Sequence, residues 1–243
     1  MSTVNDRRIG STDIACIAAL YEPQLAVDLP KHKTAADVWF RLRTGIDAPS
    51  NPRMDRGTRL ESSLLDCYRR YVGPAWRPAL ADGEWWLVKH PQHEWATCSP
   101  DAFDCSPPPH LVVEFKTQSR WARKQWGMPG TNSLATRFLY QLAWTMACCE
   151  ADTAHLLVAF GADTEDAHGT PMFLIEDTAT YWSERDAELE ARLLEYGARF
   201  VNDFVATGKP PPVKPAAHRR AFKQLIGVKT WEHLKEPQSS PQP

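Results

Sequence analysis

The chain has 243 residues and a formal net charge of −2 at neutral pH. This length can bury one sizeable hydrophobic core, and the charge excludes a uniformly basic nucleic-acid binder, so any such contact must come from local patches. The polar start and the lack of an apolar run of about 18 residues predict neither a secretory signal nor a membrane span. Six cysteines without a C-x-x-C pair favour a reduced, cytoplasmic setting over a disulfide framework.

The first third of the chain is predicted to be mainly helical. A short helix should follow Ser11 or Thr12, because either residue is a good N-cap. Apolar spacing predicts a buried helix over residues 34–43, entered at a threonine cap, and a second helix over residues 54–71. Glu61 lies on the apolar side of this second helix, either attracted to the helix start by its dipole or as part of a site.

The middle of the chain is predicted to form strands. Residues 85–89 and 94–97 read as paired strands around a turn, and their tryptophans are more often core than base-stacking residues. In residues 111–117, apolar positions alternate with Val112, Glu114 and Lys116, so one face of a strand would be apolar and the other would place a carboxylate beside an amine.

This pairing of charges predicts a metal-dependent site. An ionised carboxylate in an apolar strand needs a cation or a metal ion, because leaving it unpaired costs several kcal/mol. A second acid, Asp101, sits in a turn just before the strand. Asp101, Glu114 and Lys116 at one edge are a way to bind hard divalent cations and to position water for phosphodiester hydrolysis.

The last part of the chain is predicted to alternate basic, apolar and proline-rich segments. Residues 119–126 form a basic stretch interleaved with tryptophans, either a DNA-backbone contact or a solvated amphipathic turn. A core helix over residues 134–149 contains Gln141, whose amide needs a partner in the core or at the site. Strands are expected at residues 155–160 and 172–176, and a long helix at residues 181–206.

A proline block after Gly208 predicts a boundary. We expect one domain over residues 1–208 and a Pro-rich, partly disordered extension over residues 209–243. The extension carries a basic patch on a possible short helix, which could contact DNA, a neighbouring subunit or nothing: Lys214, His218, Arg219, Arg220 and Lys223.

The order of four motifs resembles a known family. Residues 99–101 (Ser-Pro-Asp) and 114–116 (Glu-Phe-Lys) are similar to the Pro-Asp…Glu-X-Lys signature of the restriction-endonuclease-like, or PD-(D/E)XK, nuclease superfamily. Residues 8–15 and 57–61 lie upstream, and residues 140–141 (Tyr-Gln) lie downstream. Together they resemble the YqaJ-type, lambda-exonuclease-like family of phage recombination nucleases, over roughly residues 8–208.

The resemblance implies a fold and an active site. The fold would be α/β, with a restriction-endonuclease-like core in which helices flank a central mixed β-sheet. Two Mg²⁺ or Mn²⁺ ions would be held by four groups: Asp101, Glu114, the main-chain carbonyl of Phe115, and Glu61. Lys116 would orient or help to deprotonate the attacking water, and adjacent cations should lower its pKa. Gln141 would complete the catalytic set.

The resemblance also implies DNA contacts. Arg8 and Ser11 would form a 5′-phosphate pocket through charge and a hydroxyl group, unless Ser11 only caps a helix and Arg8 is solvated. Further DNA contacts would come from Ser119, Arg120, Arg123, Lys124 and Tyr140. The partners would be double-stranded DNA ends, a single-strand annealing protein, and copies of the chain in a ring-shaped oligomer.

The resulting hypothesis is a Mg²⁺-dependent 5′–3′ double-strand exonuclease that leaves single-stranded 3′ overhangs for recombination. An endonuclease or a Cas4- or RecB-like nuclease on the same fold is an alternative, although no cysteine follows Cys149 to help hold an iron–sulfur cluster. An alternative of another class is a non-catalytic module that binds DNA ends or recruits a partner.

Overall fold

The computed structural model describes residues 8–29, 32–50, 52–72, 76–78, 80–81, 84–85, 87–104 and 109–226. The helices are α1 (Ile14–Ala18), η2 (Pro23–Asp28), α2 (Ala35–Thr44), α3 (Pro52–Val72), η3 (Arg120–Gln125), α4 (Thr136–Cys149), α5 (Ala187–Phe200), η4 (Val201–Ala206) and α6 (Arg219–Ile226). The strands are β1 (Trp76–Pro78), β2 (Leu80–Ala81), β3 (Glu84–Trp85), β4 (Val88–Lys89), β5 (Thr97–Cys98), β6 (Ala102–Asp104), β7 (Leu111–Ser119), β8 (Thr153–Glu165) and β9 (Pro171–Glu184).

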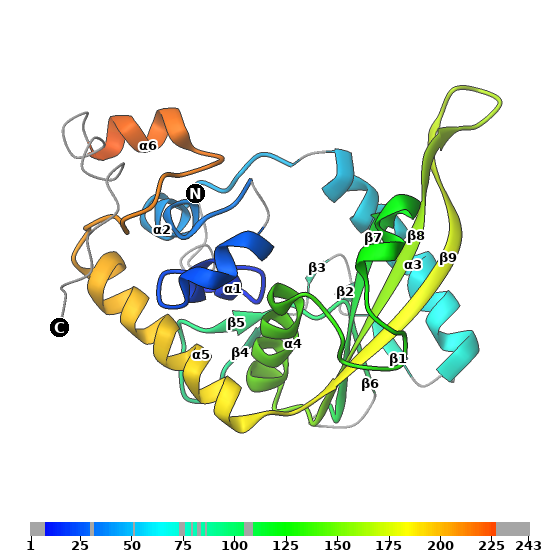
Figure 1. Ribbon diagram of the computed structural model, residues 1–243, viewed down its shortest axis with the longest axis horizontal. Coiled ribbons are helices and arrows are strands. Elements are labelled where there is room, and N and C mark those ends of the chain that lie inside the picture. The colour runs from blue at the N-terminus through cyan, green and yellow to red at the C-terminus, as the bar shows by residue number, and fades with distance from the viewer. Residues whose placement is uncertain are drawn as a thin grey trace.

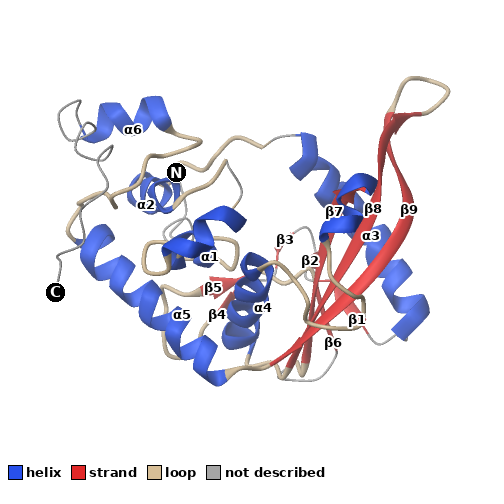
Figure 2. Cartoon of the chain, viewed as in Figure 1, coloured by secondary structure: helices blue, strands red, loops and turns tan. Residues whose placement is uncertain are grey.

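A five-stranded mixed sheet, in the order β1-β6-β7-β8-β9, forms the centre of the fold. The pair β7 and β8 is parallel, whereas β6 with β7 and β8 with β9 are antiparallel. Helices α3 and α4 flank the sheet, and α1, α2, α5 and α6 lie beyond α4 (Figures 1 and 2). The predicted α/β fold, a central mixed sheet flanked by helices, is confirmed.

Strand β7 separates the two parts of the hydrophobic core. Val113 and Phe115 pack in one cluster with α3 side chains that include Leu64 and Tyr68. Val112 belongs to the larger cluster, which includes α4. The alternation along β7 was correctly predicted, but both faces of the strand are buried, because a helix covers each side of the sheet. Glu114 therefore lies inside the protein.

Several element boundaries differ from the predictions. Neither Ser11 nor Thr12 caps α1; Asp13 precedes the helix, and its carboxylate accepts a hydrogen bond from the Gly10 N–H at 2.7 Å. The long helix begins at Ala187 instead of residue 181, because β9 continues to Glu184 and alternate residues such as Tyr181 face the core. At the end of β9 every second side chain faces the core, as in a strand. Tyr181 therefore belongs to β9 and not to the helix predicted from residue 181.

The predicted hairpin around residues 90–93 is present as a short pair of strands. Val88 and Lys89 of β4 pair with Cys98 and Thr97 of β5. Trp95 is half-buried, and its ring centroid lies 6.0 Å from that of Trp144 in α4. The side chain of Trp85, and Trp86 as a whole, lie outside the described residues, as does most of the turn predicted at residues 107–109.

The segment that follows the predicted boundary at residue 208 contacts α2. The Asp37 carboxylate accepts hydrogen bonds from the backbone N–H groups of residues 216, 217 and 218, at 2.8, 2.8 and 3.2 Å. Phe222 of α6 is fully buried against Trp39 and Phe40 of α2. Of the predicted basic patch, Lys214 and the buried His218 precede α6, and Arg219, Arg220 and Lys223 lie on this docked helix. Residues 227–243 lie outside the described residues.

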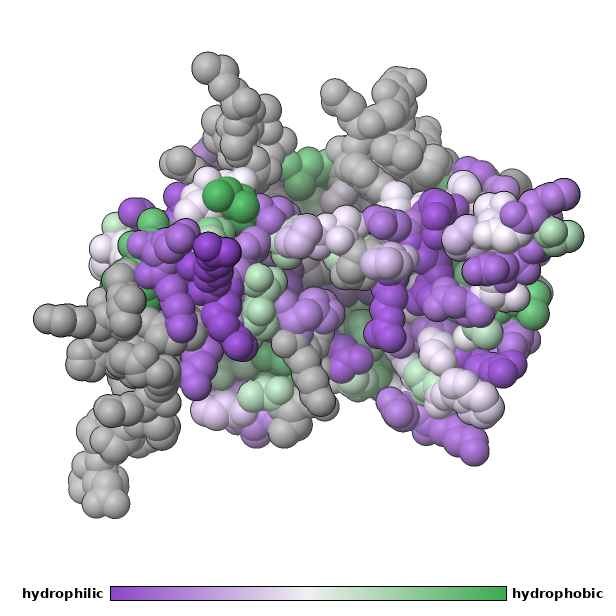
Figure 3. Space-filling view, turned by 90° about the horizontal axis from the view of Figure 1, so that it is seen from above, coloured by the Kyte–Doolittle hydropathy of each residue, from purple (hydrophilic) through white to green (hydrophobic). Residues whose placement is uncertain are grey.

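The described surface is mainly polar. On the face shown in Figure 3, hydrophilic residues dominate and apolar residues form small, separate spots. Among the helices of the described part, none has the length and hydrophobicity that crossing a membrane requires.

We predict that Phe222→Ala will loosen the C-terminal segment. Removing a buried phenylalanine typically costs about 3–5 kcal/mol, so the free energy of unfolding should fall by about that amount in urea titrations. Trypsin should also cut at Arg219 and Arg220 faster than in the wild type. Leu225→Ala is the matched control, because Leu225 lies on the same helix and is 50% exposed. Equal unfolding midpoints and cutting rates for Phe222→Ala and wild type would contradict the docking of α6.

Candidate active site

The site forms where β6 stops pairing with β7. The last residue pair of this ladder toward the site is Ala102 with Val113, and the Asp101 N–H still donates to the Val113 carbonyl at 3.0 Å. Beyond that point the Phe115 N–H has no strand partner on this side, and the Asp101 carboxylate accepts its hydrogen bond at 2.6 Å. In a β-strand the N–H and C=O of one residue point to the same side, so the Phe115 carbonyl also lies on this edge.

Three side chains hold Glu114 on the face of β7 that packs against α4. Its side chain is 3% exposed, and its Oε2 accepts hydrogen bonds from Gln141 Nε2 at 2.6 Å and from Lys116 Nζ at 3.2 Å. Thr145 Oγ1 donates to Glu114 Oε1 at 3.4 Å. Gln141 and Thr145 are four residues apart on α4 and so share one face of the helix. Thr145 was missed from the sequence, although its spacing from Gln141 is a signal that could have found it.

Charge interactions link the three predicted acidic residues to one another through Asp101 and Lys116. Burial, opposed by Lys116 and reinforced by Asp101, raises the pKa of Glu114 to about 7. Burial and the Asp101 charge also raise the pKa of Glu61 to about 7, and burial raises the pKa of Asp101. Among the described residues, Lys116 is thus the cation that lowers the pKa of all three carboxylates.

The charge state of Lys116 differs from the expectation for an ion-loaded site. Burial disfavours its ammonium, but the carboxylates of Glu114, Asp101 and Glu61 outweigh this effect and raise its pKa. In the chain alone Lys116 is therefore a hydrogen-bond donor. The lower pKa predicted for Lys116 depends on nearby cations, which would compete with it for the same carboxylates.

The chemistry of these residues fits a divalent cation. The donors are carboxylate oxygens and a main-chain carbonyl, which Mg²⁺ and Mn²⁺ prefer. No described residue donates a hydrogen bond to Glu61, and the excess of buried negative charge would be relieved by an added cation. Among the described residues, no three His, Cys, Asp or Glu side chains are already arranged as a complete metal cage. In the chain alone, Asp101 and Glu114 are instead turned to the donors Phe115, Lys116 and Gln141.

The next predicted DNA-contacting residues lie at the end of β7, where Ser119 caps η3, and on η3 itself. Ser119 is exposed and accepts a hydrogen bond from the Trp121 N–H at 3.4 Å. Arg120 forms an ion pair with Glu176 at 2.7 Å, and Arg123 forms one with Asp177 at 3.0 Å. Lys124 is exposed. Strand β9 therefore offsets two of the three cationic charges predicted to contact DNA here.

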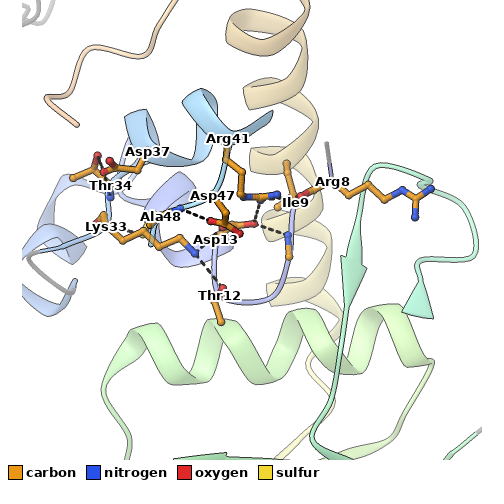
Figure 4. A network of polar contacts seen from close by, with 12 residues as sticks. Arg8, Ile9, Thr12, Asp13, Lys33, Thr34, Asp37, Arg41, Asp47 and Ala48 are labelled. Carbon is orange, nitrogen blue, oxygen red and sulfur yellow. Dashed lines mark hydrogen bonds and ion pairs between the residues drawn. The ribbon is translucent and has the colours of Figure 1, made fainter. Parts of the chain in front are cut away.

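The other predicted DNA contacts lie around the N-terminal segment. Ser11 is 6% exposed, and the Arg8 carbonyl accepts a hydrogen bond from Arg41 at 2.9 Å, while the Arg8 side chain extends away from this cluster (Figure 4). Tyr140 is buried, and its hydroxyl donates to Glu22 at 2.8 Å, whereas its neighbour Gln141 contacts Glu114. The contacts of Tyr140 are thus within the protein, and its role toward DNA remains a prediction.

A buried ion cluster holds residues 8–13 in place and was missed from the sequence. Asp13 lies between Lys33, at 2.8 Å, and Arg41, at 2.6 Å, and Lys33 also donates to Thr12 Oγ1 at 3.1 Å (Figure 4). Burial would raise the pKa of Asp13, but the two cations reverse this effect and lower it. The partners lie 20 and 28 residues away, so the position of Asp13 within the 8–15 motif was the only local signal.

The overall fold is similar to that of several solved structures of exonucleases. The crystal structure of LHK-Exo in complex with dAMP has a TM-score of 0.59 and 18% identity, and the match covers 85% of this chain and 92% of that chain. The alkaline exonuclease LHK-Exo from Laribacter hongkongensis matches over the same shares, with 18% identity and a TM-score of 0.56. A phage-related exonuclease from Haemophilus somnus 129PT has 13% identity and a TM-score of 0.53, with 83% and 96% of the two chains covered. At these identities the likeness concerns the fold.

The sequence identifies the family. The family model of the YqaJ-like viral recombinase domain matches residues 3–152, which is more than half of the chain. The chain therefore belongs to this family, as its motif order predicted. No protein with a curated description matches the chain significantly.

We predict that Asp13→Asn will destabilise the protein in a pH-dependent way. Removing one partner of a buried ion pair typically costs about 3–5 kcal/mol, so the free energy of unfolding at neutral pH should fall by about that amount. The pKa of Asp13 is lowered in the fold. Its contribution is therefore complete above its ordinary pKa of about 3.8 and is lost as the pH falls through the lower folded value.

The difference between wild type and Asp13→Asn should accordingly shrink in urea titrations as the pH is lowered below about 4. Asp47→Asn is a control, because Asp47 is an exposed residue in a loop. A difference that stays constant from neutral to acidic pH would show that charge pairing is not what Asp13 contributes.

Proposed function

We propose that the protein is a Mg²⁺-dependent deoxyribonuclease that digests double-stranded DNA from a 5′ end and leaves single-stranded 3′ overhangs for phage recombination. The observation that carries this proposal is the buried set of Asp101, Glu114 and Glu61 around Lys116, placed at the free edge of β7 in an exonuclease fold. Membership of a viral recombinase family supports the biological setting.

The ion-binding residues would be those that the sequence predicted. Two Mg²⁺ or Mn²⁺ ions would be held by four groups: Asp101, Glu114, the Phe115 carbonyl and Glu61. Bound there, such ions stabilise charge on the scissile phosphate and lower the pKa of bound water. Gln141 and Thr145 keep the Glu114 carboxylate at the strand edge, so their contribution is to positioning.

Lys116 acts on the attacking water. Its ammonium is held 3.2 Å from Glu114, which aims it at the edge where Asp101 lies. From there it donates a hydrogen bond that orients the water, and it accepts the water proton when its own pKa falls. This role needs a lysine close to the reacting phosphate, so substitution removes turnover without removing the DNA-binding surface.

The DNA contacts follow from charge and position. Arg8 and Ser11 would bind the 5′ phosphate, in a segment that the Asp13 cluster fixes. Ser119 and Lys124 would contact the DNA backbone beside the site. Arg120, Arg123 and Tyr140 would support these contacts through their partners within the protein. Other partners would be a single-strand annealing protein and further copies of the chain in a ring, in a cytoplasmic setting.

Two other hypotheses use the same surface. An endonuclease, or a Cas4- or RecB-like nuclease, would share the chemistry but not the requirement for a DNA end. A module that binds DNA ends or recruits a partner without cleavage would not need Lys116. The presence of all four candidate side chains, Glu61, Asp101, Glu114 and Lys116, favours a nuclease.

We predict that Lys116→Ala will reduce cleavage of linear duplex DNA by at least about 100-fold, the usual size of a proton-transfer contribution. Equilibrium binding of the same DNA should change little. The measurement is single-turnover cleavage with Mg²⁺ beside fluorescence anisotropy with the same substrate. Lys124→Ala should show the opposite pattern, with weaker DNA binding and an unchanged cleavage rate at saturating protein. Retained turnover in Lys116→Ala would remove Lys116 from this role.

The polarity and end requirement are tested with three substrates: 5′-phosphorylated linear duplex, 5′-hydroxyl linear duplex and covalently closed circle. We expect wild-type protein with Mg²⁺ to degrade only the linear DNA, faster with the 5′ phosphate, and Glu114→Ala to be inactive. Cutting of the closed circle would favour the endonuclease hypothesis instead. No cleavage of any substrate would favour the binding module.

A further inference from the structure

The exposed surface of η3 is less basic and more aromatic than its sequence suggests. It follows β7 directly and carries the basic stretch predicted to contact the DNA backbone. In the fold, Glu176 and Asp177 of β9 neutralise Arg120 and Arg123. The helix also exposes an aromatic residue, Trp121, which is 76% exposed.

This exposure is specific to one of the two tryptophans in the stretch. Trp126 points inward, with its ring centroid 4.9 Å from that of Phe138 and 5.4 Å from that of Tyr181. Trp121 has no comparable place in the core, although an exposed indole forgoes the stabilisation that burial would give. The Trp121 ring is therefore available to a ligand, whereas the Trp126 ring is taken up by packing within the chain.

Two cationic residues lie next to the exposed ring in the helix. The Arg120 guanidinium lies 4.8 Å from the Trp121 ring centroid, and the ion pair with Glu176 holds that guanidinium in place. Lys124 follows Trp121 by three residues, and on a 3₁₀ helix residues three apart lie on the same side. Lys124 is exposed, and the described residues offer it no ion pair. An aromatic face beside an available cation is the combination that binds single-stranded nucleic acid.

The position of the ring suits a strand that leaves the candidate active site. Trp121 is five residues beyond Lys116, with β7 continuing to Ser119. A strand rises about 3.3 Å per residue, so the indole lies on the order of 10–15 Å from the lysine. This distance corresponds to roughly three or four stacked nucleotides at 3.4 Å each.

We propose that Trp121, supported by Arg120 and flanked by Lys124, is a stacking platform for an unpaired base of single-stranded DNA beside the active site. The inference deepens the proposed function and rests on DNA being the substrate. A platform of this kind holds one strand of a frayed or partly digested duplex, because every base has a face on which an indole can stack.

The same ring could instead belong to a protein-binding surface. Met172 and Leu174 on β9, 47% and 55% exposed, are further apolar residues in the neighbourhood of the β9 acids that bind η3. The cations beside the Trp121 ring favour nucleic acid, because a purely apolar protein contact would gain nothing from them. Substitutions that separate aromatic from merely apolar character decide between the two.

The test measures binding of a fluorescently labelled oligothymidine to the full chain by anisotropy, in EDTA so that no cleavage occurs. Trp121→Ala should weaken binding by about 5- to 150-fold, the range of one base–aromatic stack. Trp121→Phe should bind within a few-fold of wild type, and Trp121→Leu should bind as weakly as Trp121→Ala. Ile46→Ala, which truncates an exposed apolar side chain in a loop, should bind as wild type.

Salt dependence separates stacking from charge. In a plot of log affinity against log salt concentration, Trp121→Ala should shift the line without changing its slope, whereas Lys124→Gln should reduce the slope by about 0.7. The melting temperatures of the Trp121 variants should equal that of wild type, because the ring is exposed.

Three outcomes would overturn the platform. These are wild-type affinity for oligothymidine in Trp121→Ala, equal affinities for Trp121→Leu and Trp121→Phe, and loss of self-association in Trp121→Ala during sedimentation with DNA binding unchanged. Binding through Trp121 in a protein that cleaves no DNA with Mg²⁺ would support the platform and refute the nuclease proposal, so the two can fail separately.

Discussion

The buried carboxylate of Glu114 is the constraint on which the site depends. A charge on the central strand of a sheet covered on both faces is tolerated only with partners, and Gln141, Thr145 and Lys116 supply them. These partners do not balance the charge, because burial keeps the pKa of Glu114 raised and the nearby Asp101 carboxylate raises the pKa of both Glu114 and Glu61. A divalent cation at this edge would satisfy both the electrostatics and the oxygen-donor chemistry of the residues present.

The fold produces this edge by ending one strand ladder early. After Ala102 and Val113, the pairing of β6 with β7 stops, and Asp101 takes the place of a neighbouring strand at the Phe115 N–H. Helix α3 brings Glu61 to the same region, and α4 holds Glu114 from the opposite face of the sheet. Backbone groups on an unpaired strand edge are available to ligands, which is why such an interruption suits a site.

Much of the central architecture could be predicted from local patterns. The alternation in residues 111–117 identified β7 and put Glu114 beside Lys116, and the helical period identified α2, α3 and α4. Contacts between distant residues could not be predicted in this way. The pairing of Asp13 with Lys33 and Arg41, the neutralisation of Arg120 by Glu176, and the docking of Phe222 on α2 join positions about 20 to 180 residues apart.

These distant contacts change the functional interpretation of the sequence. Residues 119–126 look like a basic surface, but β9 forms ion pairs with Arg120 and Arg123. Among the described residues, Lys124 has no such partner, and Trp121 beside it is an exposed indole. Thr145 gains its role only because α4 packs over Glu114. Sequence patterns therefore located the candidate catalytic groups, whereas tertiary pairing decided which charged residues remain available to a substrate.

The central claim is that the carboxylates at the β7 edge form a divalent-cation site. Isothermal titration of Mg²⁺ and Mn²⁺ into the wild-type chain and into Glu114→Gln, each with and without a DNA duplex, tests it most directly. Saturable binding in the wild type that is lost or strongly weakened in Glu114→Gln is the predicted result. Absence of saturable binding in the wild type with DNA present, or unchanged binding in the variant, would contradict the account.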